Sequence, residues 1–328
     1  MINFEYTRAT TIRTAIDAAI KNPTAQFIAG GTNLVDLMKK GVTAPSRVID
    51  INHLPLKDIS ASPTGGLMIG SLVTNSDLAS DKQAASMFPL LNMALTAGAS
   101  AQLRNMATVG GNMMQRTRCP YFYDTIMPCN KRKPGSGCAA LKGYNRMHAI
   151  FGANSTCIAV HPSDMCVALL ALDATVQISS PKGERTIAFT DFHKLPGVNP
   201  EKDNNLGKAE LITSINIPAN RFSQYSHYLK VRDRASYAFA LVSVAAALDI
   251  VDGKIRDLRL AMGGVAHKPW RLKEAEQFLK GKDATVQNFT AAAKEAMKLA
   301  RSYGHNDFKL QLAPAAIIDA LTKASRIS

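Results

Sequence analysis

The sequence predicts an α+β protein with a larger N-terminal unit and a smaller C-terminal one. Its 328 residues exceed what one ordinary domain needs, and a hydrophobic content of 46% suffices for more than one core. Segments with helical spacing of apolar residues alternate with short extended segments, which indicates mixed helices and strands. The pattern changes near residue 221, where longer apolar strands and charged helices begin. We therefore expect domains at 1–220 and 221–328.

The N-terminal part predicts a helix, a strand, a glycine turn and a second helix in succession. Apolar residues recur at helical spacing over 12–20, and Pro23 ends that helix. An extended segment over 26–29 leads into the turn at 30–33 (GGTN), and helical spacing resumes over 34–39. The two glycines permit a sharp reversal between strand and helix.

The middle of the first unit continues this alternation. Strands are predicted at 47–51 and 67–70 because short apolar runs are bounded by turn residues. A helix capped by Thr74 or Asn75 follows, and an alanine- and leucine-rich helix covers 90–97. The mixture of the two element types is already clear at this point.

The remaining elements of the first unit surround an irregular segment. A second glycine turn is predicted at 108–112 (TVGGN), and a helix at 164–171. Strands follow at 175–178 and 211–217, and Pro218 ends the last of them. Between turn and helix, the segment 116–157 has no sustained period and is rich in Pro, Gly, Tyr and basic residues. We expect it to be a long ordered insertion with an internal anchor.

The second unit has a simpler pattern. Strands are predicted at 226–231 and 255–262; between them lie an apolar stretch at 239–251 and a turn at Asp252-Gly253. Helical, charged segments then run to the C-terminus. This is typical of a smaller α+β domain.

The two glycine turns indicate a site for an anion. Backbone N–H groups that are not masked by side chains can converge on a phosphate where a strand leads into a helix. One such turn alone is explained better by the need for positive φ in a tight turn. Two of them can enclose the diphosphate of one dinucleotide. The sequence has no G-x-G-x-x-G between a strand and a helix and no Walker A motif, so a non-Rossmann flavin site fits best.

All five cysteines lie within 48 residues. A random distribution would scatter them along the chain, so their clustering indicates a metal centre. Cys119, Cys129, Cys138 and Cys157 have 9, 8 and 18 residues between neighbours. Four thiolates can complete one zinc site or one [4Fe-4S] cluster, and this spacing matches neither a standard zinc finger nor a ferredoxin. Unpaired buried thiols are the alternative. Cys166 lies in an apolar helical run and is expected to belong to the core.

The charge is concentrated where the cysteines are. Lys and Arg number 39 against 25 Asp and Glu, a net charge of +14, and the segment 116–146 supplies +6 of it. Its seven cations face a single carboxylate, Asp124. An anionic iron–sulfur cluster would be stabilised by these cations. The competing hypothesis is a zinc-stabilised nucleic-acid patch, with Tyr121 and Phe122 among its stacking residues.

No catalytic group is predicted in this chain. His161, His227 and His267 are each isolated from other ligands in sequence, and no catalytic triad or H-E-x-x-H motif is present. The most apolar run, 237–248, is too short to cross a bilayer, which takes roughly 18 to 20 residues. The N-terminus shows no readable secretory signal.

Four strings resemble the FAD-binding medium subunit of the molybdenum hydroxylases, a group that includes xanthine dehydrogenase, carbon monoxide dehydrogenase and aldehyde oxidoreductases. They are 27–34 (FIAGGTNL), 102–112 (QLRNMATVGGN), 161–164 (HPSD) and 263–269 (GGVAHKP). The resemblance covers essentially the whole chain in order. It implies a p-cresol-methylhydroxylase-type FAD-binding domain of two subdomains, followed by a smaller C-terminal α+β domain.

The insertion carries a narrower resemblance. The strings 116–124 (RTRCPYFYD), 128–132 (PCNKR) and 134–138 (PGSGC) are similar to the insertion in the FAD subunit of periplasmic aldehyde oxidoreductases of the PaoABC type. That resemblance implies an additional [4Fe-4S] cluster, with Cys119, Cys129, Cys138 and Cys157 as ligands. The β subunit of 4-hydroxybenzoyl-CoA reductase has a comparable insertion, and a reductase of that kind is the alternative.

The same resemblance implies residues around FAD. Its diphosphate loop corresponds to Gln26, Phe27, Ile28, Ala29, Gly30, Gly31, Thr32, Asn33 and Leu34. The second loop corresponds to Thr108, Gly111 and Asn112, and Asp164, Ile212 and Lys230 correspond to further contacts near the flavin. Gln26 stands where some relatives carry Lys.

The family also implies partners for the chain. A large subunit with molybdenum cofactor would oxidise the aldehyde, and a small subunit with two [2Fe-2S] clusters would relay electrons. FAD in this chain would pass them to an external acceptor. Neither a nucleic-acid partner nor a membrane span is expected. The chain would be periplasmic by export with a signal-bearing partner, or else cytoplasmic.

Overall fold

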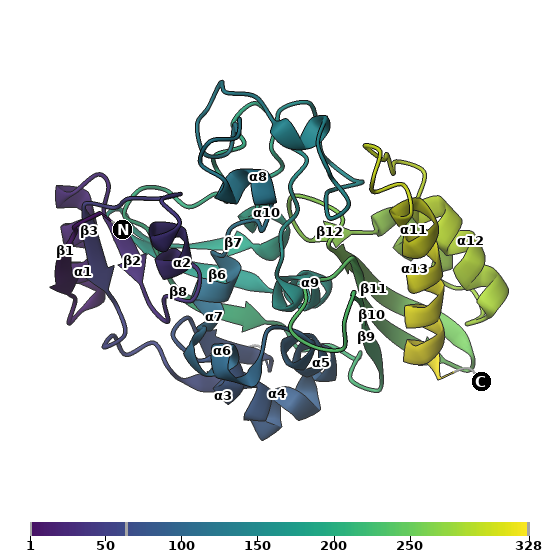
Figure 1. The fold of residues 1–328 in the computed structure, drawn as a ribbon. Coiled ribbons are helices and arrows are strands. Elements are labelled where there is room, and N and C mark those ends of the chain that lie inside the picture. The colour runs from purple at the N-terminus through teal and green to yellow at the C-terminus, as the bar shows by residue number, and fades with distance from the viewer. Residues whose placement is uncertain (1, 63–64, 327–328) are drawn as a thin grey trace.

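Three β-sheets follow one another along the molecule. The protein is described by a computed structural model that covers residues 2–62 and 65–326. In Figure 1 a small N-terminal sheet lies at one end, the C-terminal helices lie at the other, and a five-stranded sheet lies between them. The predicted α+β class is confirmed.

The N-terminal sheet is parallel and ends at the first glycine turn. Its strands are β1 (Glu5–Arg8), β3 (Arg47–Asp50) and β2 (Gln26–Ile28), in the order β1-β3-β2. Helices α1 (Ile12–Lys21) and α2 (Leu34–Lys39) connect them. Thr11 begins α1 with a capping box that it forms with Thr14, which satisfies backbone N–H groups at the helix start. The sheet therefore delivers residues 29–33 to its carboxyl edge.

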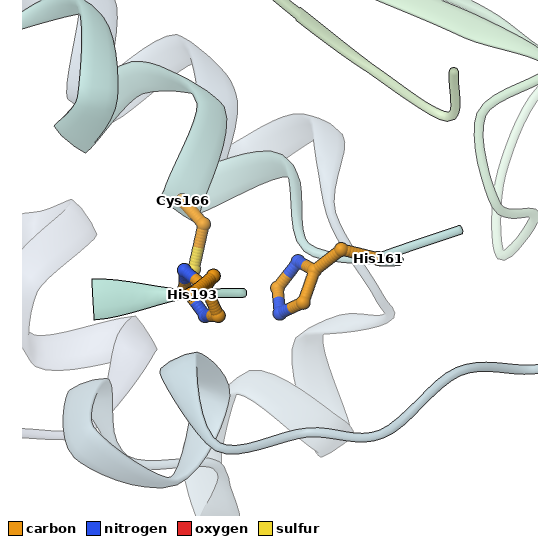
Figure 2. A group of neighbouring side chains, drawn as sticks. All are labelled: His161, Cys166 and His193. Carbon is orange, nitrogen blue, oxygen red and sulfur yellow. The ribbon is translucent and has the colours of Figure 1, made fainter. Parts of the chain in front are cut away.

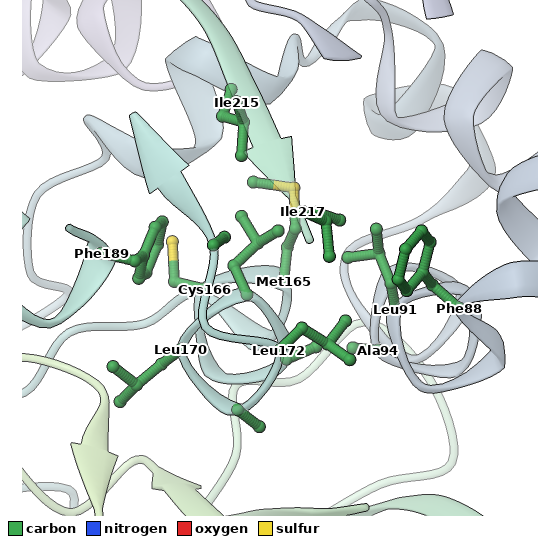
Figure 3. Packing of buried hydrophobic residues seen from close by; sticks show 14 of the residues in the cluster. Phe88, Leu91, Ala94, Met165, Cys166, Leu170, Leu172, Phe189, Ile215 and Ile217 are labelled. Carbon is green, nitrogen blue, oxygen red and sulfur yellow. The ribbon is translucent and has the colours of Figure 1, made fainter. Parts of the chain in front are cut away.

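The central sheet is antiparallel, in the order β4-β5-β8-β6-β7. Its strands are β4 (Ile59–Ala61), β5 (Leu67–Gly70), β6 (Thr175–Ser180), β7 (Gly183–Ala188) and β8 (Leu211–Ile217). The helices of this region are α3 (Asn75–Ser80), α4 (Lys82–Met87), α5 (Pro89–Ala97), α6 (Ala101–Met106), α7 (Val109–Met113), α9 (Asp164–Ala171) and α10 (Phe189–Phe192). Side chains of α5, α9 and β8 meet in one apolar core, among them Leu91, Met165 and Ile215 (Figure 3).

The cysteine insertion is irregular, as the sequence predicts. It contains the one-turn helix α8 (Pro120–Tyr123) and the 3₁₀ helix η1 (Ala139–Leu141). Cys129 and Cys138 face each other in an isolated antiparallel bridge, and Asn130 N donates to Gly137 O at 2.7 Å. The insertion, with α8 at its base, stands above the central sheet and close to α10 in Figure 1.

The C-terminal sheet is buried on both faces. Its order is β12-β11-β10-β9, with β9 (Tyr225–Val231), β10 (Val242–Val251), β11 (Lys254–Gly263) and β12 (Trp270–Arg271). Helices α11 (Lys273–Leu279), α12 (Val286–Ala296) and α13 (Lys309–Ser325) belong to the same part of the chain. Along β10, Val244 and Ala246 face the C-terminal core, whereas Ala245 and Ala247 join the core of the central sheet. Burial on both faces explains the nearly continuous apolar run in this segment.

The structure differs from the sequence-based expectation in several places: strands β1, β4 and β12 were not predicted, and two further differences concern α7 and β7. The second glycine turn at 108–112 is the start of helix α7, in which Thr108 Oγ1 accepts from Gly111 N at 3.2 Å. Gly110 is needed there because a Cβ atom would lie 3.0 Å from the Ser71 side chain. Strand β7 was also missed, since four of its six residues are exposed and polar or glycine, and only Ile187 is buried.

Replacement of Ile215 by alanine tests this core. Ile215 on β8 is fully buried, whereas Met68 on the neighbouring strand β5 is 37% exposed. We expect Ile215→Ala to lower the free energy of unfolding by about 2–5 kcal/mol, because it leaves a cavity, and Met68→Ala to change it by less than about 1 kcal/mol. Denaturant titration of both variants measures this. Equal effects would contradict the assigned faces of the sheet.

Candidate functional site

The two glycine loops border one cavity of about 730 Å³. All nine residues of 26–34 line it, together with Thr108, Gly111 and Ile212. Residues 201–204 and 206–212, which lead from the segment after α10 into the start of β8, line the same cavity. A volume of this size lies within the range of known cofactor sites.

The glycines are required because the two loops touch. A Cβ atom on Gly30 would lie 1.7 Å from the carbonyl oxygen of Met106, just before the second loop. Gly31 has a φ of 69°, which disfavours other residues. In the described part of the chain, the backbone N–H groups of Gly31 and Thr32 have no hydrogen-bond partner within the protein. These donors line the cavity and suit a diphosphate.

The predicted residues Asn112, Asp164 and Lys230 lie outside this cavity. Asn112 Oδ1 accepts from Ser163 Oγ at 2.6 Å. Asp164 forms a buried ion pair with Lys230 at 2.7 Å and accepts from Tyr228 OH at 2.8 Å. The structure thus brings Gln26 to Leu34, Thr108, Gly111 and Ile212 together in one group, and Asp164 with Lys230 in another.

Asp164 borders a second cavity of about 120 Å³. Its walls come from both domains: His161 to Asp164 from the first, and Phe239, Ser243 and Gly264 from the second. Cys119 and His148 of the insertion complete it. A long ligand such as FAD can therefore contact both domains only if it extends beyond the loop cavity.

The four insertion cysteines line one small cavity. Cys119, Cys129, Cys138 and Cys157 converge there although 37 residues lie between the first and the last. All are free thiols. Burial raises the pKa of Cys119 to about 12 and that of Cys157 to about 11. Such thiols ionise readily only beside cations or a metal, and four of them around one cavity are a candidate set of metal ligands.

The four sulfurs are not gathered tightly around one point. Four thiolates on one zinc would place their sulfurs ~3.8 Å apart, since Zn–S bonds are about 2.3 Å long. No three of these four sulfurs, all within the described residues, come within 4.8 Å of one another. Four cysteines supply the number of thiolates that one [4Fe-4S] cluster or one zinc ion takes, but the sulfurs are not gathered as one tetrahedral zinc site would require.

A histidine contacts one of these sulfurs. His148 Nε2 lies 3.1 Å from Cys119 Sγ, and burial lowers the pKa of His148 to about 4. Its backbone carbonyl accepts from Lys309 Nζ at 2.9 Å, which fixes its position against the C-terminal domain. Sequence analysis missed His148 because no motif marks it.

A separate group of His161, Cys166 and His193 is part of the interior (Figure 2). His193 Nε2 lies 2.9 Å from Met113 O, and His161 Nδ1 lies 3.4 Å from Ser163 N. Burial lowers the pKa of both imidazoles, that of His193 to about 4, so both are neutral at pH 7. Cys166 is completely buried in the apolar core, which confirms the expectation for it.

Carboxylates from outside the insertion compensate much of its positive charge. Arg116 and Lys131 share Asp203, and Arg146 pairs with Asp233 at 2.8 Å. A count within 116–146 could not include these partners, which lie more than 70 residues away. In the folded chain, the net positive charge around the insertion is therefore smaller than the +6 counted within residues 116–146.

Comparison with known proteins agrees with this geometry. Residues 2–220 match the family described as FAD binding domain in molybdopterin dehydrogenase, and residues 227–324 match the CO dehydrogenase flavoprotein C-terminal domain. The chain belongs to the FAD-binding medium subunits of the molybdenum hydroxylases. FAD is therefore its cofactor, and it works as an oxidoreductase subunit alongside a large and a small subunit.

Individual relatives cover nearly the whole medium subunit. The chain is 48% identical to the aldehyde oxidoreductase FAD-binding subunit PaoB of Escherichia coli, over 98% of each chain. It is 30% identical to the glyceraldehyde dehydrogenase medium chain of Sulfolobus acidocaldarius, over 85% of this chain and 82% of that one. A structure of CO dehydrogenase from Oligotropha carboxidovorans shares the fold, with a TM-score of 0.79, 21% identity and full coverage of both chains.

Within residues 2–62 and 65–326, no helix combines the length and the apolar character that a bilayer crossing requires.

The contact between the glycine loops yields a prediction for FAD. Gly30→Ala should weaken FAD binding about tenfold or more, because the new methyl group must displace the loop from Met106. The ratio of FAD to protein after gel filtration measures this. Gly253→Ala is the control, since it strains the β10–β11 turn at a φ of 75° far from the loops. Full FAD retention by Gly30→Ala would contradict the assignment.

Proposed function

We propose that this chain is the FAD- and [4Fe-4S]-containing electron-transfer subunit of a molybdenum-dependent aldehyde oxidoreductase. The observation that carries the proposal is the convergence of four cysteines on one cavity, with Cys119 also bordering the cavity of Asp164. The relative that is 48% identical is an aldehyde oxidoreductase subunit, which supports the aldehyde as substrate class.

The loops of the first domain hold FAD in this proposal. Residues 26–34, with Thr108, Gly111 and Asn112, form the diphosphate site, in which the free backbone N–H groups of Gly31 and Thr32 donate to the phosphate oxygens. Asp164, Ile212 and Lys230 contact the part of the cofactor nearer the flavin. FAD, when bound, collects two electrons and passes them to an external acceptor. This chain supplies binding and orientation, and no residue of it acts as a general acid or base.

The insertion holds the cluster. Cys119, Cys129, Cys138 and Cys157 supply the thiolates, and buried Lys131 lies in the wall of the same cavity. His148 positions a ring nitrogen against Cys119. Four thiolates make the oxidised centre anionic, so a nearby ammonium lowers the cost of burying it.

The domain division and the partners complete the proposal. We assign residues 1–220 to the FAD-binding domain, with the cluster insertion at about 116–157, and 221–328 to the C-terminal domain. The large partner carries molybdenum cofactor and oxidises aldehydes to carboxylic acids. The small partner carries two [2Fe-2S] clusters. Export alongside a signal-bearing partner would place the complex in the periplasm.

Metal and flavin analysis of the purified complex tests the cluster. Cys129→Ser should lower the iron content by about four atoms per copy of this chain while FAD is retained, because one [4Fe-4S] ligand is lost. Cys166→Ser is the matched control and should keep all iron, since its thiol lies in the apolar core. Unchanged iron in Cys129→Ser, or stoichiometric zinc without flavin, would overturn the proposal.

A further inference from the structure

Three charged side chains join the cysteine cavity to the FAD cavity. Lys131 lines the cavity of the four cysteines, whereas Arg116 and Asp203 line the large cavity between the glycine loops. We call Arg116, Lys131 and Asp203 the bridging triad. Asp203 lies 87 residues after Arg116 and 72 residues after Lys131 in the sequence.

The ammonium of Lys131 is the most buried charge in the triad. Its side chain is 1% exposed, and Nζ donates to Asp203 Oδ1 and, at 2.7 Å, to Pro200 O. Arg116 Nε donates to the other carboxylate oxygen at 2.7 Å. The Arg116 guanidinium also lies 4.7 Å from the ring centre of Phe122, whose side chain lines the cysteine cavity.

Packing alone does not explain why the buried side chain at position 131 carries a positive charge. Burial of an ammonium costs several kcal/mol before its partners compensate, and an apolar side chain of similar length would often be as stable. The triad contains two cations and one carboxylate, so it retains a positive charge beside the thiolates. In a poorly solvated interior such a charge acts strongly on any group that gains or loses an electron.

We propose that Lys131 raises the reduction potential of the [4Fe-4S] cluster and that Asp203 limits this effect. The inference rests on the proposed function, because it requires the cluster. Reduction adds one electron to the cluster and changes no bond or proton. The added negative charge is stabilised by the Lys131 ammonium and opposed by the Asp203 carboxylate. Asp203 is a positioning residue, since it also holds Nζ in place.

The two charges therefore predict shifts of opposite sign. Lys131→Met removes a cation and should lower the midpoint potential of the cluster. Asp203→Asn removes the anion, retains a side chain of the same shape, and should raise it. A purely structural role of the triad predicts that both variants loosen the cavity and act in the same direction.

The experiment is a redox titration of the intact complex, with the cluster followed by electron paramagnetic resonance and with iron and FAD measured on each sample. Lys133→Met is the control. Lys133 lies two residues after Lys131 and carries the same charge, but its side chain is exposed. Lys131→Arg keeps the charge and should stay close to the unmodified potential.

The outcomes separate this inference from the function on which it rests. Unmodified complex without four irons in this chain would overturn the proposed function itself. A bound cluster with the same potential in Lys131→Met as in Lys133→Met would overturn the inference alone. If Lys131→Met fails to hold the cluster, Asp203→Asn decides: a higher potential supports the inference, and an equal or lower one overturns it.

Discussion

The carboxylate of Asp203 is the contact on which the arrangement of the cofactor sites depends. It ties Lys131 and Arg116, at the two sides of the insertion, to the wall of the FAD cavity. Burial raises the pKa of Asp203, but Lys131 and Arg116 more than offset this and hold it well below its usual range. A depressed folded-state pKa means that the contribution to stability is present above the ordinary carboxylate pKa and is lost as the pH falls below it. At neutral pH the insertion is therefore held in place by a charged carboxylate.

Two further features position the sites: the close approach of the two glycine loops, and the burial of strand β10 on both of its faces. Gly30 permits the first loop to reach the carbonyl of Met106, so both loops face one cavity. Strand β10 contributes to two cores at once, which fixes the C-terminal domain against the first. The cavity beside Asp164 lies at that junction, where Lys230 of β9 supplies the counter-charge. Cys119 borders this cavity and the cysteine cavity, so the two sites share a wall.

Much of the fold could be predicted from sequence because it depends on local patterns. Helix α9 at 164–171 was predicted from its apolar run, and the cysteines were grouped by their clustering; the cap that Ser163 provides for α9 is seen only in the structure. The segment that forms α7 was predicted to be a turn because glycine disfavours helices. In the structure, Thr108 caps this short helix in spite of its two glycines. Lys131 and Lys133 are indistinguishable within the string KRK, although one is buried and the other exposed. Asp203 and His148 act through contacts distant in sequence, which a single sequence does not reveal.

The most direct test of the account is anomalous diffraction from crystals of the intact complex, recorded on both sides of the iron absorption edge. The account predicts four iron positions within the cavity bordered by Cys119, Cys129, Cys138 and Cys157, and FAD density that extends from the glycine loops toward Asp164. A single peak at the zinc edge in that cavity, or flavin density away from the two loops, would contradict it.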